Sequence, residues 1–218
     1  MITTLEAPAR KAVVQSTDSP LSDFNDHFLA AIEDIESLCR PHSHSDAIKI
    51  SWIESIVGPL LVGVQDRSIG FIQFAQQERL ADQLMRLQRQ WGKPLRHFMH
   101  SLHVQLEHEM LEYCEGRRFK FTVPIKASGT SFQQRVWETL LEIPYGHTWS
   151  YEQLAIAIGQ PTATRAVGLA NGANNIVIVV PCHRVINKNG QLGGYGGGQW
   201  RKQRLLDLEQ QTLAKARA

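Results

Sequence analysis

Apolar residues recur at intervals of three and four between residues 22 and 39, with acidic residues between them. This spacing predicts an amphipathic helix, because positions three and four apart share one face of a helix. We expect this helix to pack on its own protein, with docking of a partner as the less favoured alternative. Its apolar face holds five residues: Phe24, Phe28, Ile32, Ile35 and Leu38.

Between residues 48 and 74 the apolar positions form short runs separated by turn residues, a pattern typical of strands. We expect strands at 48–54, 59–65 and 69–74. The short connections, including Asp66-Arg67-Ser68, predict an antiparallel meander.

Helical spacing returns after the meander and predicts helices over 77–90 and 95–114. The second of these carries four histidines: His97, His100, His103 and His108. A metal site would need these side chains to converge with a further ligand. Solvated histidines on the helix surface are therefore the favoured interpretation.

A short strand is expected at 119–123, followed by a helix that ends before Pro144-Tyr145-Gly146. The helix begins with a capping box, either Thr130 with Gln133 or Ser131 with Gln134. These boundaries divide the chain into three expected parts. They are an extension with one amphipathic helix and no assigned role, an α/β domain and a C-terminal domain, at 1–47, 48–128 and 129–218.

Two further short helices are predicted over 151–158, after a capping box of Ser150 with Gln153, and over 163–170. The turn between them contains a glycine, which is typical of a helix-turn-helix. The second helix consists mostly of small residues, and Arg165 is its only charge. Such a helix can lie close to a nucleic-acid backbone and insert one side chain into the minor groove. Tight packing inside the domain is the alternative.

The charge is distributed unevenly along the chain. Residues 1–115 carry a net charge of −6 and residues 116–218 carry +8, within a total of +2. A basic half favours a polyanionic partner, because cations placed on phosphates release condensed counterions. A solvated basic surface explains the charge equally well.

Cysteine usage and hydropathy limit the class of protein. The three cysteines are widely spaced and contain no CxxC pair, which argues against a disulfide framework or a structural zinc site. Residues 1–15 lack the apolar core of a signal peptide, and no run of eighteen apolar residues occurs. We expect reduced thiols and a soluble intracellular protein.

Cys182 is the strongest candidate for chemistry. It follows the apolar run 176–180 and precedes His183, which predicts a buried strand that delivers a thiol beside an imidazole. The dipeptide alone is weak, because an isolated cysteine is more often a small buried hydrophobe.

Five motifs along the chain resemble those of the O6-alkylguanine-DNA alkyltransferases. They are Thr148-Trp149-Ser150-Tyr151, Arg165-Ala166-Val167-Gly168, Asn171-Gly172-Ala173-Asn174, Pro181-Cys182-His183-Arg184-Val185 and Gly193-Gly194-Tyr195-Gly196-Gly197-Gly198. The resemblance is strong over residues 131–209, weaker over the meander, and does not reach residues 1–47. It implies an α/β (α+β) fold. The N-terminal antiparallel meander with its helices would be ribonuclease H-like. The C-terminal DNA-binding and catalytic domain would be mostly helical and winged-helix-like, and it would contain the helix-turn-helix.

The resemblance implies DNA repair by direct reversal of damage. Cys182 would take the alkyl group from O6 of a flipped guanine and keep it, so that each molecule acts once; whether O4-alkylthymine is also a substrate stays open. Arg165 would fill the gap in the base stack. Tyr151 would assist the rotation of the nucleotide and donate a hydrogen bond to ring N3. Further DNA contacts are expected from Thr148, Ser150, Ala166 and Gly168.

An unperturbed thiol is only about a few per cent ionised at neutral pH, so the nucleophile needs a base. The resemblance assigns this role to His183, acting through a water and oriented by Glu209 on a terminal helix that starts at Trp200. We expect Glu209 to stabilise the imidazolium and so to raise the pKa of His183.

The resemblance also assigns a pocket for the base. The glycine-rich segment 193–198 would close over the base as a lid. Some relatives have serine where Gly196 stands, so only the backbone amide remains there for O6. Asn174 would bond to nearby backbone and tie the recognition helix to the active site. The expected pocket residues are Asn174, Val180, Tyr195, Gly196 and Gly197.

The sequence disfavours three other functions. A non-catalytic damage-binding protein would lack a nucleophile at Cys182. A cysteine hydrolase needs an oxyanion hole and a histidine remote in sequence. An alkylation-responsive transcription factor needs a four-cysteine zinc domain, and the chain has three cysteines.

We therefore expect an enzyme without cofactor or metal whose partner is double-stranded DNA containing alkylated guanine. It is expected to act as a monomer, away from membranes. In a bacterium we expect it in the cytoplasm, associated with the nucleoid. In a eukaryote we expect it in the nucleus.

Overall fold

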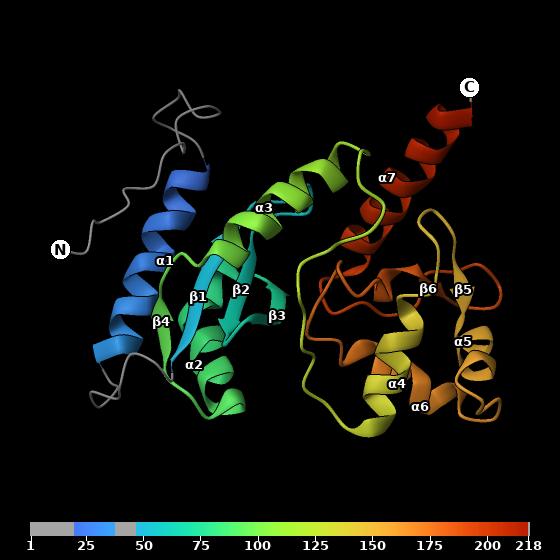
Figure 1. Cartoon of the computed structure of the whole chain (residues 1–218), viewed down its shortest axis with the longest axis horizontal. Coiled ribbons are helices and arrows are strands. Elements are labelled where there is room, and N and C mark those ends of the chain that lie inside the picture. Colours follow the sequence, from blue (N-terminus) through green and yellow to red (C-terminus); the bar gives the residue numbers. More distant parts are fainter. Residues whose placement is uncertain (1–19, 38–46, 218) are drawn as a thin grey trace.

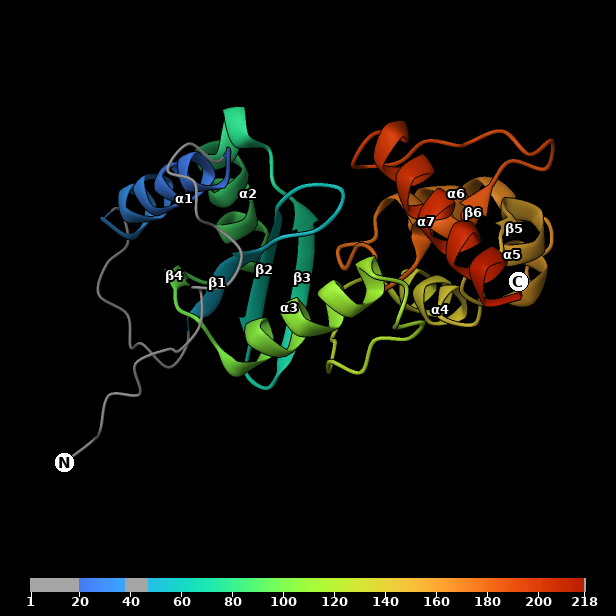
Figure 2. The same cartoon turned by 90° about the horizontal axis from the view of Figure 1, so that it is seen from above.

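The structure is a computed structural model that describes residues 20–37 and 47–217. Figures 1 and 2 show two lobes, which we call the N-terminal lobe (20–37 and 47–114) and the C-terminal lobe (129–217). The helices are α1 Pro20–Ser37, α2 Leu80–Trp91, α3 Ser101–Cys114, α4 Ser131–Leu140, α5 Tyr151–Ala157, α6 Thr164–Gly172 and α7 Gln199–Arg217. The strands are β1 Ile48–Ile53, β2 Leu60–Gln65, β3 Ser68–Phe74, β4 Leu95–His97, β5 Trp149–Ser150 and β6 Val185–Ile186. This mixed α/β architecture confirms the coarse fold class.

The N-terminal lobe is built on a four-stranded sheet in the order β3-β2-β1-β4. The antiparallel meander of β1, β2 and β3 is confirmed. The sequence did not predict β4, which pairs parallel with β1 through Leu95 and Ile48. Gly63 pairs with Phe71 across β2 and β3, and a Cβ at Gly63 would overlap the Phe71 ring.

Helices cover both faces of this sheet (Figure 2). Helix α1 packs with α2 on one face through a cluster that includes Phe24, Phe28 and Ile32, and the Phe24 and Trp52 rings meet edge to face at 5.1 Å. The prediction that α1 packs on its own protein is confirmed. The side chain of Ile35, and Leu38 as a whole, lie outside the described residues.

The predicted helix 95–114 is wrong at its start. Residues 95–97 form β4, and the helix begins only at Ser101 because His100 caps it. Nδ1 of His100 accepts from the Leu102 amide at 3.1 Å, and Nδ1 of His103 accepts from the His100 amide at 2.9 Å. The histidine pair therefore replaces the serine or aspartate that usually caps a helix.

The four histidines consequently share no helix face. His103 is fully buried and contacts the Val62 carbonyl through Nε2 at 3.1 Å, so the interpretation as a solvated histidine is wrong for this residue. Burial lowers the pKa of His103 to about 4. Across residues 20–37 and 47–217, no three His, Cys, Asp or Glu side chains gather as a metal site would require.

Two predicted strands do not form. Residues 119–123 bend at 119, 120 and 123 and pair with no strand, and the run 176–180 makes only isolated bridges. Both segments lead to the free edge of β3: Ile69 bridges Ile125, and Ile72 bridges Ile176. The chain then reverses at Ile178, whose φ is 72°, so the apolar run is buried but cannot continue as a strand.

These edge contacts join the lobes. One hydrophobic cluster runs from the inner face of the sheet, through Leu106 and Met110 of α3, to Val136, Leu140 and Leu205 of the C-terminal lobe. No helix among the described residues is both long and apolar enough to cross a membrane.

Candidate active site

Cys182 lies at the start of a single 3-10 turn, Cys182–Arg184, which follows directly on Pro181. The thiol is 4% exposed. Burial raises the pKa of Cys182, because a thiolate loses hydration there. Hydrogen bonding from Asn174 and the positive charge of Lys202 act in the opposite direction without cancelling the effect of burial. The sulfur is a buried thiol that needs a base.

Asn174 holds the segment that carries the thiol. Its Nδ2 donates to Cys182 Sγ at 3.0 Å and to the Val180 carbonyl at 2.9 Å, while its Oδ1 accepts from the Ile176 amide at 2.9 Å. Asn171 Nδ2 contacts the Cys182 carbonyl at 3.4 Å. The two asparagines lie at and just after the end of α6, so their hydrogen bonds tie the end of this helix to the segment that carries the thiol.

His183 is fully buried and points at α7. Its Nε2 lies 3.0 Å from Glu209 Oε1. An ionised carboxylate only accepts hydrogen bonds, so Nε2 carries the proton in the neutral ring and Nδ1 is the free acceptor. Nδ1 has no hydrogen-bond partner among the described residues. Cys182 and His183 lie in one 3-10 turn rather than on an extended strand, on which adjacent side chains point to opposite sides.

Glu209 is the centre of a buried network. It accepts hydrogen bonds from the Tyr113 hydroxyl at 2.7 Å, the Gly146 amide at 2.9 Å and the Arg184 guanidinium at 2.9 to 3.2 Å. Burial alone would raise the pKa of Glu209, but the hydrogen bonds and charges of His183 and Arg184 outweigh it and lower the pKa to about 2. Glu209 is therefore ionised at every physiological pH.

The expected rise in the pKa of His183 is wrong. Burial lowers this pKa, and Glu209 offsets the effect only in part, while Arg184 and Lys202 lower it further. Burial is the largest cause, because a charged ring would lose its hydration there, and Arg184 adds to it because its positive charge already pairs with Glu209. The neutral imidazole is the resting form.

The helix-turn-helix is formed by α5 and α6. The capping boxes of Thr130 with Gln133 and of Ser150 with Gln153 are both present, which settles the earlier choice for α4. Helix α6 begins at Thr164 and extends two residues beyond the predicted end. Trp137 of α4 donates through Nε1 to the Ala170 carbonyl at 2.8 Å and so holds α6 in place.

One face of α6 is open to solvent. Arg165, Ala166 and Leu169 are exposed there, and Leu169 is 73% exposed. Gly168 instead faces Tyr151, where an added Cβ would stand 3.8 Å from the ring. Thr148 and Ser150 are half-buried, and the Ser150 hydroxyl is used by the cap of α5. The exposed, nearly smooth face is the candidate surface for nucleic acid.

Tyr151 and Tyr195 lie close to the thiol. Burial raises the pKa of Tyr151, and the charge of Cys182 adds to this, so the hydroxyl remains a donor. The Tyr195 hydroxyl is buried near the Cys182 thiol, and burial and the Cys182 charge raise its pKa as well. Gly193 packs directly on Tyr151, since a Cβ there would stand 3.0 Å from Cε2 of the ring.

Of the other expected pocket residues, Val180 is the least suited. Its carbonyl already accepts from the Cys182 amide at 2.8 Å and from Asn174 at 2.9 Å, which fills both lone pairs. Gly196 is exposed, with open space where a Cβ would stand, and Gly197 is buried.

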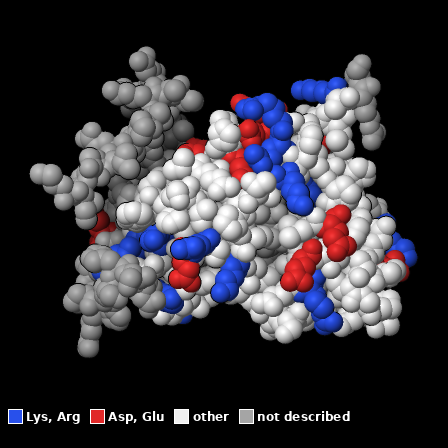
Figure 3. Space-filling view, viewed as in Figure 1, with Lys and Arg blue, Asp and Glu red and all other residues white. Residues whose placement is uncertain are grey.

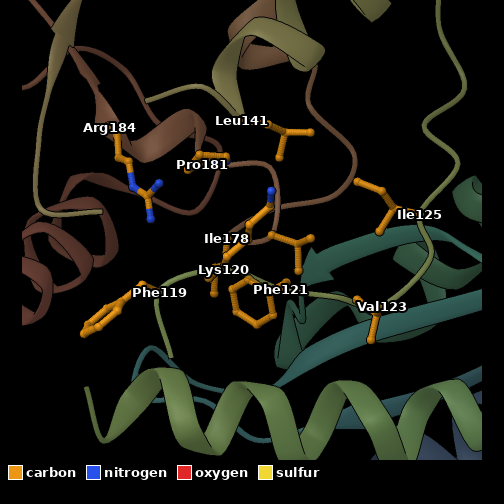
Figure 4. Close-up of a pocket in the computed structure, with 10 residues that line it drawn as sticks. Phe119, Lys120, Phe121, Val123, Ile125, Leu141, Ile178, Pro181 and Arg184 are labelled. Atoms are coloured by element: carbon orange, nitrogen blue, oxygen red, sulfur yellow. The ribbon is translucent and has the colours of Figure 1, made fainter. Parts of the chain in front are cut away.

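A separate cavity of about 220 Å³ lies beside this site (Figure 4). It is lined mainly by apolar side chains of the linker and of the 178–181 turn, among them Phe119, Phe121, Ile178 and Pro181. Arg184 also lines it, whereas Cys182 does not. The cavity is therefore distinct from the space in front of the thiol.

The face of the molecule in Figure 3 carries basic and acidic side chains interspersed, without a continuous basic patch. The charge asymmetry between the halves of the sequence therefore does not appear as a uniform surface on this side.

Sequence reasoning missed several residues of the site. Arg184 is part of the Pro-Cys-His-Arg motif, so the sequence showed its place beside His183, but it did not show that Arg184 pairs with Glu209. Tyr113 and Lys202 gave no signal, because their roles depend on contacts between distant segments. Lys202 is fully buried, and its Nζ donates to the Val185 carbonyl at 2.6 Å.

A model of a known protein family matches the C-terminal part of the chain. Residues 131–211 match the family described as 6-O-methylguanine DNA methyltransferase, DNA binding domain. The site therefore lies within a DNA-binding domain of this type. A methylated-DNA--protein-cysteine methyltransferase of Methanosarcina barkeri is 38% identical over 161 residues, which are 74% of this chain and 96% of that protein. The chain belongs to the methylated-DNA--protein-cysteine methyltransferase family.

Other relatives match over the C-terminal part with higher identity. The inducible methylated-DNA--protein-cysteine methyltransferase of Bacillus subtilis is 56% identical over 107 residues, 49% of this chain. The Mycobacterium bovis methylated-DNA--protein-cysteine methyltransferase is 59% identical over 97 residues, 44% of this chain. The matches span 60% and 59% of the length of these relatives.

Solved structures share the fold. The Mycobacterium tuberculosis OGT, crystallised in complex with DNA, has a TM-score of 0.63 and 39% identity, and the match covers 75% of this chain and 94% of that chain. The O6-methylguanine-DNA methyltransferase from Pyrococcus kodakaraensis has a TM-score of 0.52 and 25% identity over 74% of this chain and 98% of that chain.

Proposed function

We propose that this protein repairs DNA by transferring the alkyl group from O6 of a damaged guanine to Cys182, once per molecule. The observation that carries the proposal is the buried cluster at the end of α6, where Asn174 contacts the sulfur and Glu209 orients the neighbouring histidine. Family membership and the DNA-binding domain support it.

The proposed reaction is an in-line displacement. His183 Nδ1 takes the thiol proton through a water, and the thiolate attacks the alkyl carbon. A sulfur–carbon bond forms as the carbon–O6 bond breaks, and the electron pair of the broken bond passes to the guanine. The guanine then takes up one proton from solvent, and His183 returns the thiol proton to solvent. Tyr151 is the proposed hydrogen-bond donor to ring N3. The Gly196 amide and backbone groups of Tyr195 are the proposed partners of O6 and of the base edge. No step regenerates the thiol.

The lowered pKa of His183 suits this role. A base must be unprotonated before it can act, and burial holds His183 neutral at neutral pH. When the imidazole takes the proton, Glu209 stabilises the new charge from 3.0 Å away. The histidine therefore gains a proton only when the thiol loses one.

The base must leave the duplex to reach a thiol that is 4% exposed. We propose that α6 lies along the minor groove, with Ala166 against the backbone and Arg165 in the place of the flipped nucleotide. Thr148 and Ser150 flank this helix as further proposed contacts. Double-stranded DNA with alkylated guanine is the proposed partner.

Replacement of Arg165 by alanine tests the flipping. Unstacking costs a few kcal/mol, so we expect Arg165→Ala to slow transfer from duplex DNA by about tenfold or more. Transfer from free O6-benzylguanine base should be unchanged, because no stack must be opened. Arg135→Ala removes another exposed charge, from α4, and serves as control. Equal slowing with both substrates would contradict the wedge role.

The affinity for duplex DNA should depend on salt. We expect a fourfold rise in salt concentration to weaken binding by at least about tenfold, because cations on phosphates release counterions. Fluorescence anisotropy with undamaged duplexes of different sequence measures how the binding constant changes with salt concentration. It also measures how little the affinity depends on the sequence. A complex that is insensitive to salt would argue against phosphate contacts.

The finer description of the fold and of the protein's state belongs to the same proposal. We propose a ribonuclease H-like domain over residues 48–128 and a winged-helix-like domain over residues 129–218, with residues 1–47 as an extension whose helix α1 packs on the first of these domains. We propose that the protein acts as a monomer in the cytoplasm, with the nucleoid, of a bacterium or in a eukaryotic nucleus. Sedimentation with and without DNA tests the monomer.

A further inference from the structure

The glycine-rich segment that leads into α7 contacts the N-terminal lobe. Figures 1 and 2 show the first turn of α7 directed toward the sheet. Arg201 in this turn donates through Nε to the Val57 carbonyl, in the loop between β1 and β2, at 2.8 Å. Its Nη1 donates to the Gly197 carbonyl, also at 2.8 Å. One guanidinium thus joins the N-terminal lobe to the segment 193–198.

Aromatic rings hold this guanidinium on two sides. The Arg201 Cζ lies 4.9 Å from the centroid of Phe74 at the end of β3, and 4.4 Å from that of Trp200. A guanidinium stacked on ring faces loses much of its freedom, and its two hydrogen bonds gain direction. Arg201 is half-buried, so water competes only in part for its donors.

Phe74 also contacts the glycine-rich segment directly. A Cβ at Gly197 would overlap the Phe74 ring and stand 3.0 Å from Arg201 Cδ, so only glycine fits at this position. The rings of Phe74 and Tyr195 meet edge to face at 5.7 Å. Tyr195 in turn places its buried hydroxyl near Cys182. A continuous chain of contacts therefore leads from β3 to the thiol.

We propose that Arg201 and Phe74 form a latch through which the N-terminal lobe holds the segment 193–198 closed over Cys182 and limits the size of the alkyl group. This rests on the proposed function. A methyl group needs the segment close, so that Gly196 reaches O6. A larger group needs it to move outward, against the latch. Arg201 is thus a positioning residue that sets specificity from outside the pocket.

The test compares two duplexes that differ only in the O6 substituent, methyl or benzyl. We expect Arg201→Met to raise the ratio of the benzyl to the methyl rate constant by about tenfold, through a slower methyl and a retained benzyl reaction. Arg201→Lys, which keeps the charge and one donor group, should show a smaller rise. The control is Arg204→Met, which removes an exposed charge from the same helix and should leave the ratio unchanged.

A ratio in Arg201→Met within about twofold of that in Arg204→Met overturns the proposal, because general damage to the fold would slow both substrates alike. If circular dichroism shows that Arg201→Met is unfolded, the ratio of the benzyl to the methyl rate constant is measured in Arg201→Lys and Phe74→Leu instead. A ratio in both within about twofold of that in Arg204→Met then overturns the proposal.

Hydrogen exchange separates this proposal from the proposed function. We expect the amides of residues 193–198 to exchange faster in Arg201→Met than in Arg204→Met, without any substrate. If the wild-type protein accepts neither alkyl group, the proposed function fails while the exchange result still decides on the latch. Equal exchange in the two variants overturns the latch.

Discussion

Cys182→Ala should accept no alkyl group from any substrate, while its affinity for duplex DNA stays within about twofold of the wild-type value. The sulfur is the only proposed acceptor, and its removal leaves the exposed face of α6 intact. Incubation with a duplex containing O6-methylguanine, followed by mass spectrometry, measures the effect. The wild-type protein should gain one methylene unit of mass, located in the peptide that contains Cys182.

Cys114 supplies the control for this experiment. It is a second free thiol, partly buried, and burial raises its pKa as it does for Cys182. Cys114→Ala should transfer the alkyl group at the wild-type rate. Alkylation that persists in Cys182→Ala, or that is lost in Cys114→Ala, would refute the assignment of the nucleophile.

Glu209→Gln should lower the free energy of unfolding by about 3–5 kcal/mol, because it leaves the buried Arg184 without its charged partner. It should also slow alkyl transfer by about a hundredfold, since the neutral amide stabilises the imidazolium of His183 less well. Urea unfolding and single-turnover kinetics measure the two effects. The control Glu142→Gln removes an exposed carboxylate of the same lobe and should change neither. A loss of stability below about 1 kcal/mol would contradict the role of this network.

The same substitution predicts a dependence on pH. The pKa of Glu209 is lowered from 4.5 to about 2 in the folded protein. The ionised carboxylate therefore stabilises the fold fully at pH values above 4.5, the pKa in the unfolded chain. This stabilisation is lost as the pH falls toward 2, the pKa in the folded protein. A shift of this size corresponds to about 3 kcal/mol. The stability difference between wild type and Glu209→Gln should shrink by about this amount as the pH falls from about 5 to 2. A difference that is constant over this range would exclude the linkage.

Local signals in the sequence predicted local structure well. The boxes of Thr130 with Gln133 and Ser150 with Gln153 each close within four residues, so the helices they start are set by neighbouring side chains. The meander followed from short turns between apolar runs. By contrast, the His100 cap of α3 was missed, because histidine seldom occupies that position and the apolar spacing continued across it.

Distant contacts could not be predicted in this way. The run 176–180 has the composition of a strand, but it meets only the edge of β3 and then reverses. The lowered pKa of His183 depends first on its burial and then on Arg184, which shares the Glu209 carboxylate. Tyr113 reaches Glu209 across 96 positions, and Arg201 reaches Val57 across 144.

The sequence by itself determined the candidate residues for the proposed chemistry, the antiparallel meander and the capped starts of α4 and α5, because motifs, turns and caps act over a few residues. Only the tertiary structure decided how buried the thiol is, which nitrogen of His183 is free, and that the N-terminal lobe contacts the segment 193–198. These properties depend on burial and on charges brought together from separate segments, and burial is a property of the packed chain rather than of any stretch of it.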